Sequence, residues 1–153
     1  MNYTAVILLC FFGWLSSTPF NQFEASQQTS MGGRQESGKT IHYRIKFVVK
    51  KSSNNLKFNT LWLGVDNVDI SLRKADGSFL ENNQFEKGDT IQIFAYKRFL
   101  PNEGGALEYR AEHPEKTVPK EYKGSALLKY SIKGKTKYYI IPEIKKLPRV
   151  NLP

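Results

Sequence analysis

Lysines and tyrosines alternate with apolar residues near the C-terminus, in the stretch ALLKYSIKGKTKYYIIPEIKK of residues 126–146. Ammonium groups attract anions, and tyrosine rings offer flat surfaces for stacking. The candidate anionic-ligand surface comprises Lys129, Lys133, Lys135, Lys137 and Tyr139. A simpler interpretation is that these lysines keep the outer face of a sheet soluble and protect its edge from aggregation. The sequence leaves both interpretations open.

No set of residues has the spacing of a catalytic or cofactor site. The chain contains no Gly-x-Ser-x-Gly nucleophile elbow and no phosphate-binding glycine loop. Its two histidines, His42 and His113, are too far apart for a zinc signature. The acidic residues lack the spacing of a calcium loop, so we expect them to cap turns. The pattern favours a protein that is not an enzyme and uses no metal or cofactor.

A long segment is the second candidate recognition element. Residues 99–124 contain three prolines and mixed charge, and loops of this length in a small domain are often functional. The candidate recognition residues within it are Glu108, Tyr109, Arg110 and His113. The segment could also contain a short strand at residues 106–111. A hydrolase or a calcium-dependent binding domain that uses this loop or the acidic turns is the alternative to a non-catalytic function.

The positive charge of the chain is concentrated in its last quarter. Of the net charge of +9, the main part comes from residues 116–153, which hold ten basic and two acidic residues. Hydrophobic residues make up 40% of the chain, enough for a packed core. The charge asymmetry favours anionic partners without selecting among them.

An apolar run near the N-terminus predicts export. Residues 5–15, AVILLCFFGWL, have the length of the hydrophobic region of a signal peptide and are too short to span a bilayer. We therefore expect residues 1–20 to be a signal peptide, cleaved between Leu15 and Ser26, or a short membrane anchor. Lipid attachment at Cys10, the only cysteine, is a further alternative. The expected location is the periplasm, the cell surface or the medium.

The remaining chain is predicted to form one all-β domain. Residues 21–39 are rich in Gln, Ser and Gly, which is typical of a flexible linker. From residue 40, apolar and polar residues alternate with period two, and Gly, Asn and Asp mark the turns. Strands are expected at residues 40–50, 56–64, 68–74 and 90–98, followed by a C-terminal hairpin. Residues 40–148 are thus predicted to be a single antiparallel β-sandwich of immunoglobulin-like size, and residues 149–153 a tail.

The turn of the C-terminal hairpin has two candidate registers. If Lys133–Lys135 is a three-residue loop, Tyr130 pairs with Tyr138, and Tyr139 shares the outer face with the lysines. If a two-residue turn begins at Gly134, Tyr130 pairs with Tyr139, and Tyr138 faces outward. Both registers leave one tyrosine among the lysines.

Several segments resemble a group of bacterial proteins. FNTLWLG, FEKGDTIQIFA, YKGSALLKYSIKGKTKYYIIPEIKKLP and the closing NLP are similar to uncharacterised small exported β-sandwich proteins of Bacteroidota-type bacteria, over residues 40–153. The resemblance implies a sandwich fold and an envelope location, with no activity to transfer. We expect a non-catalytic module that binds or scaffolds at the cell envelope. Its expected partner is a protein, an anionic lipid or a polysaccharide; nucleic acid is disfavoured, because single strands need a stacking groove.

Overall fold

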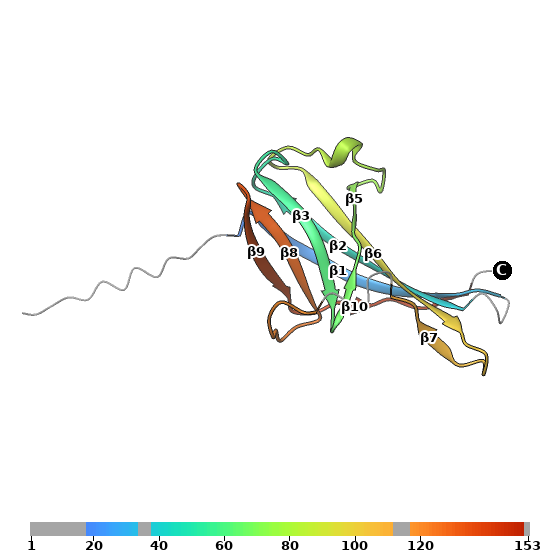
Figure 1. Ribbon diagram of the computed structural model, residues 1–153. Coiled ribbons are helices and arrows are strands. Elements are labelled where there is room, and N and C mark those ends of the chain that lie inside the picture. Colours follow the sequence, from blue (N-terminus) through green and yellow to red (C-terminus); the bar gives the residue numbers. More distant parts are fainter. Residues whose placement is uncertain (1–17, 34–37, 112–116, 152–153) are drawn as a thin grey trace, which may run out of the picture.

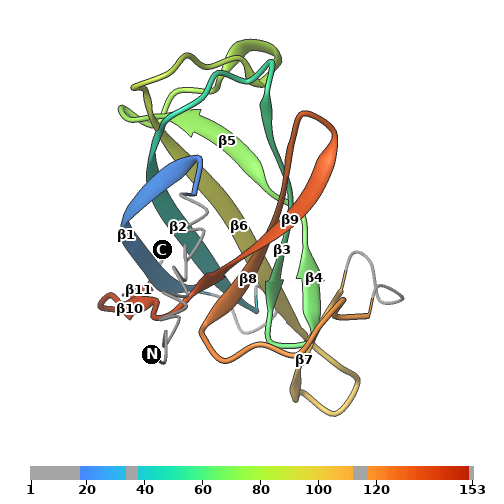
Figure 2. The same ribbon diagram turned by 90° about the vertical axis from the view of Figure 1, so that its left-hand side faces the viewer.

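The computed structural model describes residues 18–33, 38–111 and 117–151, and its strands form two sheets that pack face to face (Figures 1 and 2). The larger sheet has the order β10 (Lys145–Lys146), β1 (Phe20–Met31), β2 (Lys39–Val49), β6 (Thr90–Pro101) and β5 (Ser71–Lys74), with β11 (Val150–Asn151) also paired to β1 and β7 (Leu107–Tyr109) to β6. The smaller sheet has the order β4 (Asp66–Val68), β3 (Leu56–Leu63), β8 (Ala126–Ile132) and β9 (Lys135–Ile141). The predicted all-β sandwich is confirmed.

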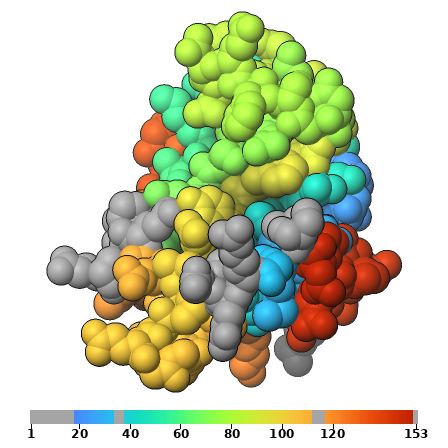
Figure 3. All heavy atoms as spheres, turned by 90° about the vertical axis from the view of Figure 1, so that its right-hand side faces the viewer, coloured from blue at the N-terminus to red at the C-terminus, as the bar shows by residue number. Residues whose placement is uncertain are grey.

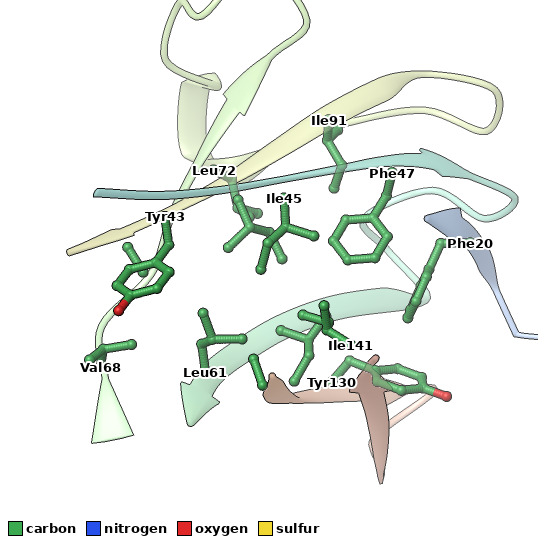
Figure 4. Close-up of a cluster of buried hydrophobic side chains, with 14 of the residues drawn as sticks. Phe20, Tyr43, Ile45, Phe47, Leu61, Val68, Leu72, Ile91, Tyr130 and Ile141 are labelled. Atoms are coloured by element: carbon green, nitrogen blue, oxygen red, sulfur yellow. The ribbon is translucent and has the colours of Figure 1, made fainter. Parts of the chain in front are cut away.

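The core lies between the two sheets and follows from the alternation of the sequence. In β2 the odd-numbered residues point inward, and Ile45 and Phe47 are fully buried. They meet Leu61 and Leu128 of the smaller sheet across the interior, and Figure 4 shows side chains of both sheets in one cluster. Because side chains of a strand alternate between its faces, this single apolar face specifies the register of each strand.

Residues 20–31 form strand β1, so the flexible linker predicted for residues 21–39 is wrong. The strand pairs with β2 in antiparallel fashion from Phe20, opposite Val49, to Met31, opposite Lys39. Its many Gln and Ser side chains bury little apolar surface, which is why composition indicated a linker. The strand is held instead by backbone hydrogen bonds on both sides, to β2 on one and to β10 and β11 on the other.

The C-terminal residues also belong to the sandwich, which corrects the predicted tail at residues 149–153 and the domain bounds of 40–148. Lys146 lies opposite Gln27, and Val150 lies opposite Ser30, both in parallel register. In Figure 3 these C-terminal residues lie against the N-terminal strands. The domain therefore reaches from about residue 18 to residue 151, because its first strand and its last two strands complete one edge of the larger sheet.

One further segment differs from its predicted structure, and a second agrees with one of the two alternatives considered for it. Residues 68–74, predicted as one strand, form parts of β4 and β5, which lie in different sheets. The chain crosses between the sheets at residues 69–70, while Val68 and Leu72 both point into the shared core. Period two continues through the crossing, so the pattern could not show the break. Residues 99–124 contain the end of β6 and all of β7, in agreement with the short strand considered there.

The predicted signal peptide or anchor at residues 1–20 falls largely outside the described residues. Those begin at Thr18, whose hydroxyl donates a hydrogen bond to the Phe20 carbonyl (2.9 Å). Within the described ranges, no helix has the length and apolar character needed to cross a bilayer.

We expect Phe20→Ala to lower the free energy of unfolding by about 3–5 kcal/mol, because it empties an aromatic site in the core. The Phe20 ring is fully buried, and its centroid lies 4.8–5.4 Å from those of four other rings: Phe47, Phe58, Tyr130 and Tyr139. Denaturant unfolding measures the loss. The matched control is Phe23→Ala in the same strand, because the Phe23 side chain is 56% exposed and its loss should cost less than about 0.5 kcal/mol. Equal losses in the two variants would contradict the central role of Phe20.

Candidate functional site

The C-terminal hairpin turns at Lys133 and Gly134, so neither predicted register is correct. Ile132 lies opposite Lys135, and the two turn residues have φ of +48° and +80°. Positive φ at both positions is the signature of a type I′ turn, which matches the twist of the strands. Lysine seldom adopts this conformation, so the sequence did not suggest it. The backbone N–H of Lys133 donates to the Asn55 carbonyl at 2.9 Å, which holds the turn against the loop before β3.

This register places Tyr139 inside and Tyr138 outside. Tyr139 lies opposite the buried Leu128, and its ring centroid is 5.1 Å from that of Phe20. Burial raises the pKa of Tyr139. Tyr139 was predicted to belong to the anionic-ligand surface, and the structure corrects this, because the ring packs in the core. Tyr138 faces outward instead, with its ring centroid 6.3 Å from that of Trp62.

The four predicted lysines do gather at one end and edge of the smaller sheet. Lys129 lies on the outer face opposite Tyr138, and Lys133 lies in the turn. Lys135 and Lys137 lie on β9, the edge strand, opposite Ile132 and Tyr130; they share the inward-facing phase of Tyr139 but are exposed at the edge of the sheet. Two lysines that were not among those predicted lie on the outer face with Lys129. Lys57 is on β3 beside β8, and the Lys120 ammonium lies 5.6 Å from the centroid of the Tyr138 ring. We call this set the lysine surface: Lys57, Lys120, Lys129, Lys133, Lys135 and Lys137.

The lysine surface carries uncompensated charge. In the described ranges the ion pairs are Lys46 with Glu24, at 2.7 Å, and Lys97 with Asp66, and neither involves a lysine of this surface. Other basic residues of the C-terminal region lie away from this surface. Lys145 and Lys146 lie in β10, at the edge of the other sheet. The basic C-terminus is therefore two separate regions of charge.

Residues 117–124 form a strap beside the outer face of the smaller sheet. The Tyr122 hydroxyl accepts a hydrogen bond from the Gly64 N–H (3.0 Å) and lies within donating distance of the Gly64 and Trp62 carbonyls (3.0 and 3.2 Å). A hollow of about 690 Å³ lies between the strap, Val65 and Ile140. The strap brings Lys120 over Tyr138, and thus contributes to the lysine surface.

The predicted recognition loop contributes two residues to a second, smaller hollow. Tyr109 and Arg110 line a pocket of about 260 Å³ together with Ala111 and with residues of β4 and β6: Asn67, Val68, Tyr96, Arg98 and Leu100. The other two predicted residues are not part of it. Glu108 accepts a hydrogen bond from the Asn102 side chain at 2.7 Å within the β6–β7 hairpin, and His113 lies outside the described residues.

Asn67 is the residue of this pocket that sequence reasoning missed. It is only 3% exposed, and neither its amide nitrogen nor its amide oxygen has a hydrogen-bond partner in the structure. Buried polar groups almost always have partners, so such a group needs an explanation. The signal was present in the polar DNVD stretch that forms β4, but only the tertiary fold shows that its asparagine is buried.

Two of the acidic turn residues, Asp76 and Asp89, have the capping role that was predicted, whereas Asp66 pairs with Lys97. The Asp76 carboxylate accepts hydrogen bonds from the Ser78 hydroxyl (2.7 Å) and N–H (2.8 Å), which lower the pKa of Asp76. Asp89 accepts the Glu86 N–H at 2.8 Å. Within the described ranges, no three His, Cys, Asp or Glu side chains gather as metal ligands would. His42 contacts the Ser30 hydroxyl at 3.1 Å on the exposed face of the larger sheet.

The chain matches no protein-family model, no curated protein and no solved structure. Two features of the molecule bear on its function: the lysine surface and the pocket between β4, β6 and β7.

We expect the protein to lose stability at alkaline pH through Tyr43, which lies in the core near the second pocket. Burial, and then the negative charges of Asp66 and Tyr109, raises the pKa of Tyr43 from 10.0 to about 12. The unfolded state thus loses this proton at lower pH than the folded state, so the stabilisation is complete below pH 10 and disappears as pH rises toward 12. At pH 11 the loss is about 1.4 kcal/mol. Denaturant unfolding of the wild type and Tyr43→Phe between pH 9 and 11 measures it. The same alkaline loss in both proteins would contradict the raised pKa.

Proposed function

We propose that the protein is a non-catalytic, exported β-sandwich module that binds an anionic polymer at the cell envelope through its lysine surface. The observation that supports the proposal is that six lysines surround the hairpin end of one sheet, none of them in an ion pair within the described chain. Lys57, Lys120 and Lys129 lie on its outer face, Lys133 lies in the turn, and Lys135 and Lys137 are exposed on the other face of the edge strand β9. Because no acidic side chain of the described chain pairs with them, these lysines are available to an anionic partner.

The arrangement suits an extended anion better than a small one. Exposed ammonium groups on a sheet surface do not converge on one point, so each contributes a weak, screened attraction. A polymer with regularly spaced negative groups gains from several such contacts at once, and releases counterions when it binds. Envelope polysaccharides have this chemistry, and the half-buried Tyr138 ring between Lys120 and Trp62 offers a flat apolar contact to a sugar ring.

The apolar run at residues 5–15 supports the export part of the proposal. It precedes β1 by only a few residues, so a signal peptide could be removed close to the folded domain. The location is the periplasm, the cell surface or the medium after cleavage, and the membrane when residues 5–15 are retained.

Removal of two edge lysines should weaken binding to a polyanionic polysaccharide such as polygalacturonate. For Lys135→Gln/Lys137→Gln we expect at least about a fivefold loss of affinity, and a decrease of about 1–2 in the slope of log affinity against log salt. Calorimetry at several salt concentrations measures both quantities. The matched control is Lys145→Gln/Lys146→Gln, which removes the same charge from the edge of the other sheet.

An equal loss of affinity in both double variants would contradict a defined binding surface, because it would show that only the net charge matters. Vesicles with anionic lipids, used in place of the polysaccharide, test the lipid alternative with the same two variants. Binding to vesicles but not to the polysaccharide would contradict the polymer proposed here.

The fold also limits where a signal peptidase can cut. Phe20 is fully buried at the centre of the aromatic cluster, so a cut after it would remove a core residue. Of the predicted interval from Leu15 to Ser26, we expect only cuts that leave Phe20 in place. Expression of the full-length chain in a bacterial host, followed by fractionation and intact-mass measurement, should give a product whose first residue lies between Ser16 and Phe20. A stable exported product that begins after Phe20 would contradict this limit.

A further inference from the structure

We propose that the pocket between β4, β6 and β7 binds one acidic sugar unit, a ring that carries a carboxylate and hydroxyl groups. The inference goes beyond the proposed function, since the pocket uses none of the lysines of the lysine surface. The inference rests on three features of the pocket. It is lined by two arginines and two tyrosines, and it contains one buried asparagine, Asn67, whose amide atoms have no hydrogen-bond partner.

The pocket exists because the edge of β6 is left open in the middle. On the side away from β2, strand β5 pairs with β6 at residues 91–94, and β7 pairs with it at residues 99–101. Figure 1 shows β7 farther along β6 than the end of β5. Between these two partners, β4 of the other sheet approaches β6 where the chain crosses between the sheets. A strand edge with polar backbone groups thus borders a hollow, which is a common setting for a ligand.

Two arginines give this pocket an affinity for a carboxylate. Arg98 is on β6, and Arg110 follows β7; the Arg110 N–H donates to the Arg98 carbonyl at 3.0 Å, which holds the two residues opposite each other. Neither arginine forms an ion pair in the described chain. A guanidinium presents paired N–H donors whose geometry matches a carboxylate, so two of them at one pocket favour an anion there.

Two aromatic rings give the pocket an affinity for the C–H face of a sugar. Tyr96 is 50% exposed and lines the pocket from β6, and Tyr109 lines it from β7. The Tyr109 ring packs against two residues of β6: its centroid lies 5.6 Å from the centroid of the Phe99 ring and 4.6 Å from the Lys97 ammonium. Rings that are fixed before binding lose little conformational freedom on contact with a ligand.

The hydrogen-bonding groups of Asn67 favour an acidic sugar over a simple anion as the ligand. Its amide nitrogen needs an acceptor, and its amide oxygen needs a donor; both atoms are buried and lack partners. A carboxylate or a sulfate can only accept, so it would leave the amide oxygen unsatisfied. A hydroxyl group can accept from the nitrogen and donate to the oxygen. The ligand that satisfies both Asn67 and the arginines therefore carries hydroxyls as well as a negative charge.

The size of the pocket limits the ligand to one ring. Its volume of about 260 Å³ is below the range of about 300–1,000 Å³ that is typical of sites for drug-sized molecules. A single sugar unit, free or at the end of a chain, fits this limit, while the neighbouring units of a polymer would lie outside on the protein surface.

Titration of the ¹⁵N-labelled full-length protein with galacturonate tests the inference. Galactose, which lacks the carboxylate, and inorganic sulfate, which is an anion without a hydroxyl group, serve as matched controls. We expect galacturonate to shift the Asn67 side-chain amide signals with an affinity at least about tenfold higher than that of either control. No shift at Asn67, or an equal response to sulfate, would overturn the proposal, the latter because it would show an anion bound by the arginines alone.

Two variants separate binding from folding. Asn67→Leu replaces an unsatisfied buried amide with an apolar group of similar shape, which is neutral or stabilising for a fold; we expect an equal or higher Tm together with at least tenfold weaker galacturonate binding. Arg98→Gln should weaken binding to a similar degree without a change in Tm. Unchanged binding in either variant would overturn the proposal.

The double variant Lys135→Gln/Lys137→Gln is the control for the lysine surface, and should bind galacturonate as the wild type does. An equal loss of galacturonate binding in this variant would overturn the assignment to the pocket. The proposed function fails on a different result, an unchanged affinity of the same variant for polygalacturonate.

Discussion

The contact of the Phe20 ring with both sheets is the interaction on which the other features depend. Phe20 belongs to β1 of the larger sheet, and its ring meets Phe47 of the same sheet and Phe58, Tyr130 and Tyr139 of the smaller one. The inward Tyr139 ring packs against the Phe20 ring, while the next residue of the hairpin register, Tyr138, lies outside near Lys120 and Lys129. A polar strand with few other buried side chains is held in the sandwich by this one residue and by its backbone pairing.

Sequence alternation predicted those strands whose stability comes from burial on one face. The inward residues of β2 and β6, such as Ile45 and Ile93, could be assigned in advance for this reason. Strand β1 could not, because backbone pairing on both sides carries most of its stability. The crossing between the sheets at residues 69–70 could not be predicted either. The alternation of apolar residues continues unchanged through it, because the strands on both sides of the crossing face the same core.

The candidate sites also differ in how far the sequence could predict them. The lysines of the hairpin are close in sequence, so their proximity needed only a hairpin, whereas the facing direction of Tyr138 and Tyr139 depended on a lysine with positive φ in the turn. Asn67, Arg98 and Arg110 are far apart in the chain, and only the approach of β4 to the open edge of β6 brings them together. Tyr109 and Arg110 were predicted as recognition residues from the length of their loop, without knowledge of the residues opposite.

The parallel pairing of β10 and β11 with β1 also constrains how the protein can fold. Gln27, in the first strand, is the direct neighbour of Lys146, close to the end of the chain. Contacts between such distant positions raise the contact order, and high contact order is associated with slow folding. During synthesis the outer edge of β1 stays open until residues 145–151 have left the ribosome. The nascent chain thus holds an incomplete sheet while more than a hundred residues are added between β1 and the two strands that pair with its outer edge.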